Sequence, residues 1–208
     1  MSQADLSREV ARRVFATEFN DSTYTFKESD DERAPNYALL PTGDRANRVF
    51  AVGTLTETED VGDESEYWRG RVVDPTGTFF VYAGQYQPEA AAVLREAEPP
   101  MYVAVVGKPR TYEPEEGSIN VSLRPESISI VDDAVRDRWV VETAERTLDR
   151  IEATQEWETQ RDDPEGGSTA PTNEYAQMAR ERYDSPVENY RQAVVQALES
   201  LEDIEATA

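Results

Sequence analysis

The sequence predicts a mainly β fold, in which a five-stranded barrel is flanked by an N-terminal helix and a C-terminal helical extension. From Arg48 to Val131 apolar residues alternate with polar ones in five runs, as they do in half-buried strands. A single helical segment, residues 88–98, separates the third run from the fourth. Outside this region apolar residues recur at helical spacing. These observations together indicate one barrel with helical appendages.

Residues 1–22 are predicted to form an amphipathic helix. Val10, Val14 and Phe15 recur at helical spacing, with Leu6 one turn before them and Phe19 one turn after. The polar run at 20–22 is a typical helix end. We expect this helix to dock on the barrel.

The barrel is predicted over residues 36–133. Its five strands are expected at 48–61, 67–74, 78–84, 101–112 and 119–131. Gly53 lies inside the first strand, where it marks a bend, and Pro75-Thr76-Gly77 turns the second strand into the third. Three strands, a helix and two further strands form the order of the OB fold, whose helix plugs the open end of the barrel. A β-sandwich is the general alternative, and the position of the single helix favours the OB fold.

Three segments follow the barrel. A long helix is predicted over residues 134–160, an acidic linker over 161–173 and a helical pair over 174–205. A detached pair this short cannot bury a core alone, so we expect it to bind a partner. The residues predicted for that contact form one apolar helix face: Tyr190, Val194, Leu198 and Leu201.

The charge of the chain is strongly acidic. Asp and Glu number 43 against 21 Lys and Arg, and the only lysines are Lys27 and Lys108. Intrinsic disorder is one explanation for such a composition, but the alternating runs argue against it for the middle of the chain. Adaptation to high salt explains it better, because carboxylates hold hydrated cations. The net charge then reflects the solvent, and a nucleic-acid binder needs only a local basic patch.

The composition excludes several classes of function. The chain contains no Cys and no His, which removes disulfides, thiolate zinc sites, Cys nucleophiles and His-dependent triads. Phosphate-binding glycine motifs and the Gly-x-Ser-x-Gly motif are absent, and paired aspartates fall in expected loops. We therefore expect a protein that is not an enzyme and uses no metal or cofactor. No apolar run approaches the roughly 18 residues of a membrane span, and the N-terminus is too charged for a signal peptide, so a cytoplasmic protein is expected.

Two parts of the barrel carry a pattern typical of single-strand binding. OB folds bind single strands with aromatic platforms and cations on the second and third strands and in the flanking loops. Strand alternation places Trp68, Val72, Phe79 and Val81 in the core and their neighbours outside. The outward Phe80 and Tyr82 have an alternative position beneath a helix, and residues 107–118 have an alternative as an ordinary charged hairpin. The residues predicted to contact nucleic acid are Tyr67, Arg69, Arg71, Phe80, Tyr82, Lys108, Arg110, Tyr112 and Arg124.

The block "RVVDPTGTFFVYAGQYQP" (residues 71–88) also carries a family resemblance, together with residues 8–57 and the tail 190–202. On these stretches the chain resembles the haloarchaeal replication protein A (RPA)-associated family of OB-fold proteins. The resemblance implies a role in DNA replication, recombination and repair, in a hetero-oligomer with replication protein A. It transfers no catalytic residues. Two functions follow: an accessory single-stranded DNA-binding protein, or a scaffold that binds replication protein A without contacting DNA.

Overall fold

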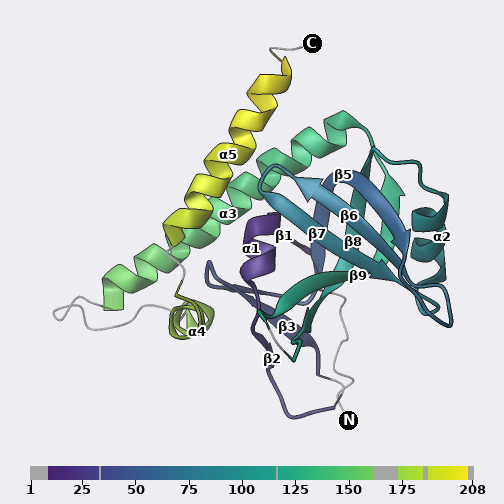
Figure 1. Ribbon diagram of the computed structural model, residues 1–208. Coiled ribbons are helices and arrows are strands. Elements are labelled where there is room, and N and C mark those ends of the chain that lie inside the picture. The colour runs from purple at the N-terminus through teal and green to yellow at the C-terminus, as the bar shows by residue number, and fades with distance from the viewer. Residues whose placement is uncertain (1–8, 33, 116, 162–172, 185–186, 206–208) are drawn as a thin grey trace, which may run out of the picture.

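Five strands close into a barrel, as predicted. They are β5 (Val49–Asp60), β6 (Trp68–Asp74), β7 (Gly77–Ala83), β8 (Met101–Tyr112) and β9 (Asn120–Ile130). The structure is a computed structural model and describes residues 9–32, 34–115, 117–161, 173–184 and 187–205. The strand order is β5-β6-β7-β9-β8, and β8 pairs back with β5. Helix α2 (Pro88–Glu96) lies between β7 and β8 in the chain, so the architecture is an OB fold (Figure 1).

Strand β5 serves both halves of the barrel and bends at Gly53. It pairs with β8 over Val49–Leu55 and with β6 from Thr54 onward. A Cβ atom at Gly53 would lie 2.5 Å from the carbonyl oxygen of Val73. Only glycine allows the two backbones to approach this closely, which agrees with the bend predicted at this position.

Helix α2 covers one end of the barrel. Pro88 occupies its first turn, where the missing N–H costs no hydrogen bond. Ala90, Ala91 and Leu94 are buried on the face that contacts β5, β6, β7 and β9. Figure 1 shows the helix at the outer end of the barrel, away from the other helices.

Among the described residues 9–22, only α1 (Ala16–Asp21) is helical, which corrects the prediction of one helix running to residue 22. Residues Arg12–Arg13 form the short strand β1, parallel to β5, and the Arg12 N–H donates to the Arg48 carbonyl at 2.8 Å. Pairing with the barrel edge thus replaces the expected first turns. Val14 and Phe15 are buried, but Val10 is exposed, so the spacing among these residues was not that of a helix face. Residues 1–8 lie outside the described residues.

A second, smaller sheet was not predicted. It is antiparallel and consists of β2 (Thr25–Lys27), β3 (Asn36–Leu40) and β4 (Asp44–Ala46). The predicted barrel boundary at residue 36 is therefore too early, since residues 36–46 belong to this sheet and the barrel strands begin at Val49. Strands of three to five residues are too short for alternation to show in the sequence.

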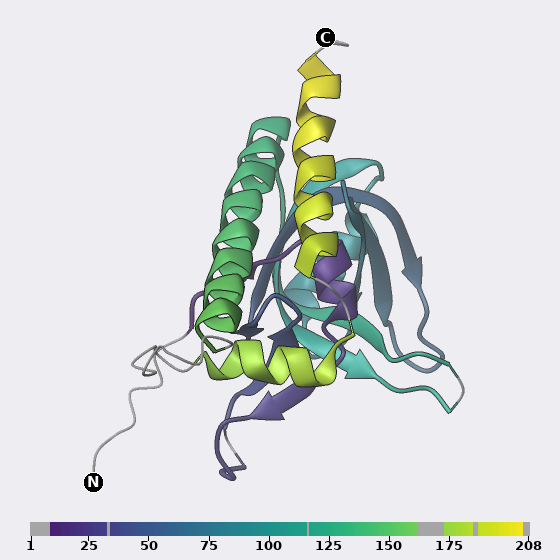
Figure 2. The same ribbon diagram turned by 90° about the vertical axis from the view of Figure 1, so that its left-hand side faces the viewer.

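Three helices complete the described chain: α3 (Asp133–Arg161), α4 (Glu174–Arg182) and α5 (Val187–Glu205). The Asn173 side chain caps α4 by accepting from the Ala176 N–H at 3.1 Å. The rest of the predicted linker, residues 162–172, lies outside the described residues. Helices α3 and α5 lie side by side, and α4 crosses below them (Figure 2).

The last helix is docked on the chain, which corrects the prediction of a detached pair. Tyr190, Val194 and Ala197 are buried, and the Tyr190 hydroxyl donates to the Asp21 carboxylate at 2.9 Å. Two of the four predicted partner residues, Tyr190 and Val194, are therefore buried where α5 packs against α1 and α3. The two remaining predicted residues differ from these, because Leu201 is half-buried and Leu198 is exposed. An apolar helix face indicates which side of the helix is buried, but it does not indicate which element covers that side.

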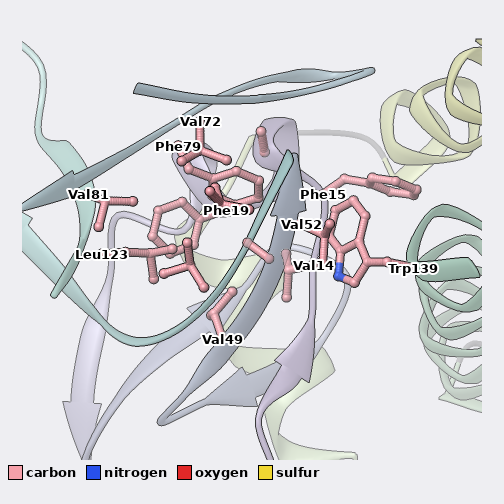
Figure 3. Close-up of a cluster of buried hydrophobic side chains, with 14 of the residues drawn as sticks. Val14, Phe15, Phe19, Val49, Val52, Val72, Phe79, Val81, Leu123 and Trp139 are labelled. Atoms are coloured by element: carbon pink, nitrogen blue, oxygen red, sulfur yellow. The ribbon is translucent and has the colours of Figure 1, made fainter. Parts of the chain in front are cut away.

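One continuous core joins the barrel to α1, α3 and α5. Figure 3 shows Phe79, Val81 and Leu123 inside the barrel and Phe15 facing Trp139 at its edge. The rings of Phe15 and Trp139 meet edge to face with centroids 5.6 Å apart, and the Trp139 indole donates to the Phe50 carbonyl at 2.9 Å. Within the described ranges, no helix has the length and apolarity needed to cross a membrane.

Candidate nucleic-acid interface

A groove of about 750 Å³ lies on the outer face of the barrel. Its walls come from β6 and the residue before it, from β7, and from the end of β8 and the start of β9, with α1 contributing one residue. Six of the nine predicted contact residues line it: Tyr67, Arg69, Phe80, Tyr82, Arg110 and Tyr112. Segments more than forty residues apart in the sequence therefore meet at one site, as the OB topology predicts.

Aromatic rings form much of this groove. Tyr67 and Tyr82 stack with their centroids 5.7 Å apart and their planes inclined by 22°. Phe80 lines the same groove with an exposed side chain, and Tyr112 reaches in from β8 with 65% of its surface exposed. Neither Phe80 nor Tyr82 is buried beneath a helix, so the alternative position does not occur. An apolar ring with an accessible face can stack on any base.

The position of Tyr67 is fixed by its neighbours. Its backbone N–H donates to the Asp60 carboxylate at 3.0 Å, and the Gly62 N–H donates to the same oxygen at 3.1 Å. These backbone hydrogen bonds lower the pKa of Asp60. On the other side the ring lies against Gly84, where a Cβ atom would come within 2.8 Å of the Tyr67 Cδ2. The loop before β6 and the end of β7 therefore hold the ring in its stacked position.

The two arginines of β6 differ in their surroundings. Arg69 lines the groove, but its guanidinium lies 2.5 Å from a Glu59 carboxylate oxygen and 3.7 Å from one of Glu57. Arg71 lies outside the lining residues, opposite Phe80 in the β6–β7 register. Its charge faces the groove from the neighbouring strand, since directly opposed residues share one face of a sheet. Arg69 is thus partly neutralised within the chain, whereas Arg71 has a hydroxyl neighbour, Thr56, at 3.5 Å.

The remaining cations lie along β8 and β9. Arg110 lines the groove, whereas Lys108 and Arg124 do not. Lys108 stands directly opposite Arg124, and Arg110 stands opposite Ser122. Burial lowers the pKa of Lys108, and the nearby charges of Arg48, Arg124 and Arg110 lower it further, against the opposing effect of Glu126. The predicted residues therefore form one groove and an adjoining cationic cluster.

Sequence reasoning missed several lining residues. Most of them belong to the β8–β9 hairpin or to β7. Alternation predicted these strands, but it could not predict that the hairpin lies close to β7. Asn20 was expected only to end a helix; its side-chain amide donates to the Thr78 carbonyl at 3.0 Å at the edge of the groove. No pattern in the sequence indicates that contact. The missed residues are Asn20, Thr78, Thr111, Ile119, Asn120, Val121 and Ser122.

The acidic side chains do not gather into a metal site in the part of the chain that the structure describes. Asp132 illustrates their structural use, because its carboxylate accepts from the Val135 N–H at 2.9 Å and caps the start of α3. Asp74 is buried and accepts from the N–H groups of Ala16, Thr76 and Gly77 at 2.7–2.9 Å. It thereby fixes both the β6–β7 turn and the start of α1.

Comparison with known proteins supports the fold. No protein-family model and no curated protein matches the sequence. Among solved structures, the chain is similar to one from the Stn1–Ten1 complex of S. pombe, with a TM-score of 0.57 and 12% identity over 71% of this chain and 98% of that one. This likeness shows the OB fold.

Two smaller proteins are matched more weakly. An OBody bound to hen egg-white lysozyme gives a TM-score of 0.38 and 13% identity, covering 61% of this chain and 94% of that one. A small single-stranded DNA-binding protein from Streptomyces coelicolor gives a TM-score of 0.30 and 19% identity, covering 42% of this chain and 95% of that one.

Proposed function

We propose that the chain binds single-stranded DNA in the groove between β6, β7 and the β8–β9 hairpin. It acts as an accessory subunit of replication protein A in DNA replication, recombination and repair. One observation carries the DNA-binding part: four accessible aromatic rings and two arginines converge on a single groove. The role beside replication protein A comes from the sequence resemblance described above.

The chemistry of the groove suits a strongly saline medium. Base stacking on an aromatic side chain contributes about 1–3 kcal/mol per base and tolerates any sequence. Phosphate contacts lose affinity steeply with salt, because their gain comes from counterion release. A groove rich in rings, with Arg69 already paired to Glu57 and Glu59, therefore relies mainly on stacking. This balance fits a chain of net charge −22 better than a dense basic patch would.

A hetero-oligomer remains part of the proposal. The similar OB-fold chain from S. pombe was solved as part of a complex, and such a barrel is therefore compatible with assembly. On α5, Leu198 and Val195 keep exposed apolar side chains, 37% and 51% accessible, whereas Tyr190 and Val194 are buried. Leu198 is thus the member of the predicted partner face best placed to contact another subunit.

Fluorescence anisotropy with labelled oligo-dT in molar KCl tests the DNA-binding part on the isolated full chain. We expect saturable binding in the micromolar range. Replacing both Tyr82 and Tyr112 with Ala should weaken binding more than Lys108→Gln, because the rings supply most of the contact. Absence of binding by the unmodified chain would refute the proposal, and equal affinity of all variants would refute the stacking site.

A second measurement separates the accessory role from the scaffold role. Purified haloarchaeal replication protein A is mixed with the full chain and analysed by size-exclusion chromatography, with and without oligo-dT. Co-elution together with DNA binding by the isolated chain supports the accessory subunit. Co-elution without DNA binding supports the scaffold, and no co-elution contradicts the partnership in either form. Leu198→Ser should weaken the complex more than Leu198→Met.

A further inference from the structure

Three cations lie side by side on the β8–β9 ladder. Lys108 is directly opposite Arg124, and Arg110 follows two residues after Lys108, so the three side chains share one face of the sheet. Arg48 adjoins them and pairs with Glu126 at 2.8 Å. In the part of the chain that the structure describes, the Glu126 carboxylate is near enough to raise the pKa of both Lys108 and Arg124, but it is paired with Arg48. We call Lys108, Arg110 and Arg124 the cationic ladder.

The cationic ladder is under mutual repulsion. Burial lowers the pKa of Arg124 and the charge of Arg110 lowers it further, against the opposing effect of Glu126, just as burial and the neighbouring cations lower the pKa of Lys108. In a chain with twice as many acidic as basic residues, such a cluster is the exception. An anion between these side chains relieves the repulsion, and a phosphodiester is an anion of suitable size and charge.

The ladder connects the main groove to a second one. Arg110 lines the first groove, and Arg124 lines a second groove of about 560 Å³. Tyr86 stands in this second groove with 83% of its surface exposed, in the turn between β7 and α2. Glu89 and Glu126 line this groove beside Tyr86 and Arg124. An accessible ring therefore lies in the groove that Arg124 lines, outside the groove that holds the stacked pair Tyr67 and Tyr82.

We propose that the second groove is an additional nucleotide subsite, in which a base stacks on Tyr86 while its phosphate lies on Arg110 and Arg124. This subsite extends the single-strand binding proposed above and rests on it. Glu89 and Glu126 also line the groove and repel phosphate, so the groove takes the base and the ladder takes the phosphate. A single strand then runs from the first groove across the ladder to Tyr86.

Oligomer length separates the two grooves in an experiment. Anisotropy is measured in molar KCl for oligo-dT of about four and about twelve nucleotides, lengths within the range of OB-fold site sizes. Tyr86→Ala should leave the affinity for the short oligomer unchanged and weaken the long one about tenfold, whereas Tyr86→Phe should bind both like the unmodified chain. If Tyr86→Ala binds the long oligomer as tightly as the unmodified chain does, the subsite is refuted while the first groove stands. If the unmodified chain binds neither oligomer, the proposed function itself fails.

A charge variant tests the phosphate part independently. Arg124→Gln is compared with Arg146→Gln, which removes the same charge from the exposed Arg146–Asp149 pair on α3, away from the ladder. We expect Arg124→Gln to reduce the slope of log K against log salt by about 0.7 for the long oligomer, the contribution of one phosphate contact to a single strand. Arg146→Gln should leave that slope unchanged. Equal slopes for the two variants contradict a phosphate on Arg124.

Discussion

The rings of Tyr67 and Tyr82 stack on the outer face of the barrel, 5.7 Å apart between centroids and inclined by 22°. The β6–β7 register places Arg69 opposite Tyr82, so the two tyrosines are diagonal neighbours rather than directly opposed. Stacking holds the two rings against each other at the side of the groove. Tyr67 is still 45% exposed, so part of the pair remains accessible for stacking on a base.

Removing one ring of this pair should weaken single-strand binding. Tyr82→Ala should raise the Kd for oligo-dT about tenfold, since one lost stacking contact is worth about 1–3 kcal/mol. Tyr82→Phe should bind nearly as the unmodified chain does, because the ring is retained and only the hydroxyl is lost. Anisotropy titration in molar KCl measures both. A loss in the Phe variant as large as that in the Ala variant would show that a hydrogen bond of the hydroxyl, not stacking, dominates.

Gly84 should control binding without touching the strand. A Cβ atom there would lie 2.8 Å from Cδ2 of Tyr67, so Gly84→Ala has to displace the ring from its stack. We expect a several-fold loss of affinity in the Gly84→Ala chain. The same substitution in a Tyr67→Ala background should have little further effect, because the displaced group is absent. Additive losses in this double-mutant cycle would contradict the positioning role.

Lys108 should give binding a pH dependence. Its pKa is lowered from 10.5, chiefly by burial and then by Arg48, so the free protein loses this charge at a lower pH than an ordinary lysine does. A bound phosphate favours the charged form and raises that pKa again. Affinity should therefore fall as the pH rises through the lowered pKa of the free protein, and binding should take up protons in that range.

Lys108→Arg is the matched variant, because arginine keeps its charge throughout this range. Tyrosine ionisation affects both proteins alike, so the difference between their anisotropy titrations isolates Lys108. A steeper decline in the unmodified protein is expected. Parallel pH profiles would show that Lys108 makes no contact with the strand.

Much of the barrel and of the first groove follows from strand alternation. Alternation separated Val72 and Phe79, which are buried, from Tyr67 and Phe80, which line the groove. Alternation predicts these positions because each strand has one face on the core, and successive side chains point alternately to the core and to the outside. Residues on one strand, such as Arg110 and Tyr112, are then brought to β7 by the OB topology.

Other features depend on contacts that no local pattern records. Residues 9–15 have apolar spacing resembling a helix, yet pairing between Arg12 and Arg48 on the barrel edge decides their conformation. Tyr190 and Val194, which were expected to contact a partner, are instead buried where α5 packs against α1 and α3, while Leu198 on the same face stays exposed. Amphipathicity gives the face that is buried, and only the tertiary structure gives the surface that covers it.

Two adjacent valines test whether α5 belongs to the core. Val194 is buried and Val195 is 51% exposed, so the same substitution removes the same atoms from two environments. Val194→Ala should lower the free energy of unfolding by about 2 kcal/mol, from lost burial and the remaining cavity. Val195→Ala should change it by less than about 0.5 kcal/mol. Thermal or urea denaturation monitored by circular dichroism measures both, and similar values would show that α5 detaches from the chain in solution.

A buried ion pair joins the N-terminal helix to α3. Glu18 is 1% exposed, its Oε2 lies 2.6 Å from the Arg150 guanidinium, and Thr42 of the β3–β4 turn donates to its other oxygen. Glu18→Gln leaves the Arg150 charge buried without a counter-ion, so the free energy of unfolding should fall by about 3 kcal/mol. The same change at Glu188, whose pairing with Arg191 is exposed, should cost no more than about 1 kcal/mol.

A further variant shows whether the charge itself is responsible for that loss. Replacing both members, Glu18→Leu with Arg150→Met, removes the uncompensated charge and fills the space with apolar atoms. The double variant should regain most of the stability lost in Glu18→Gln, because an ion pair in the interior gains little over well-packed side chains of similar volume. Denaturation in molar KCl provides the comparison. A double variant less stable than Glu18→Gln would mean that the hydrogen bonds from Thr42 and Arg150, rather than the balance of charge, hold α1, the β3–β4 turn and α3 together.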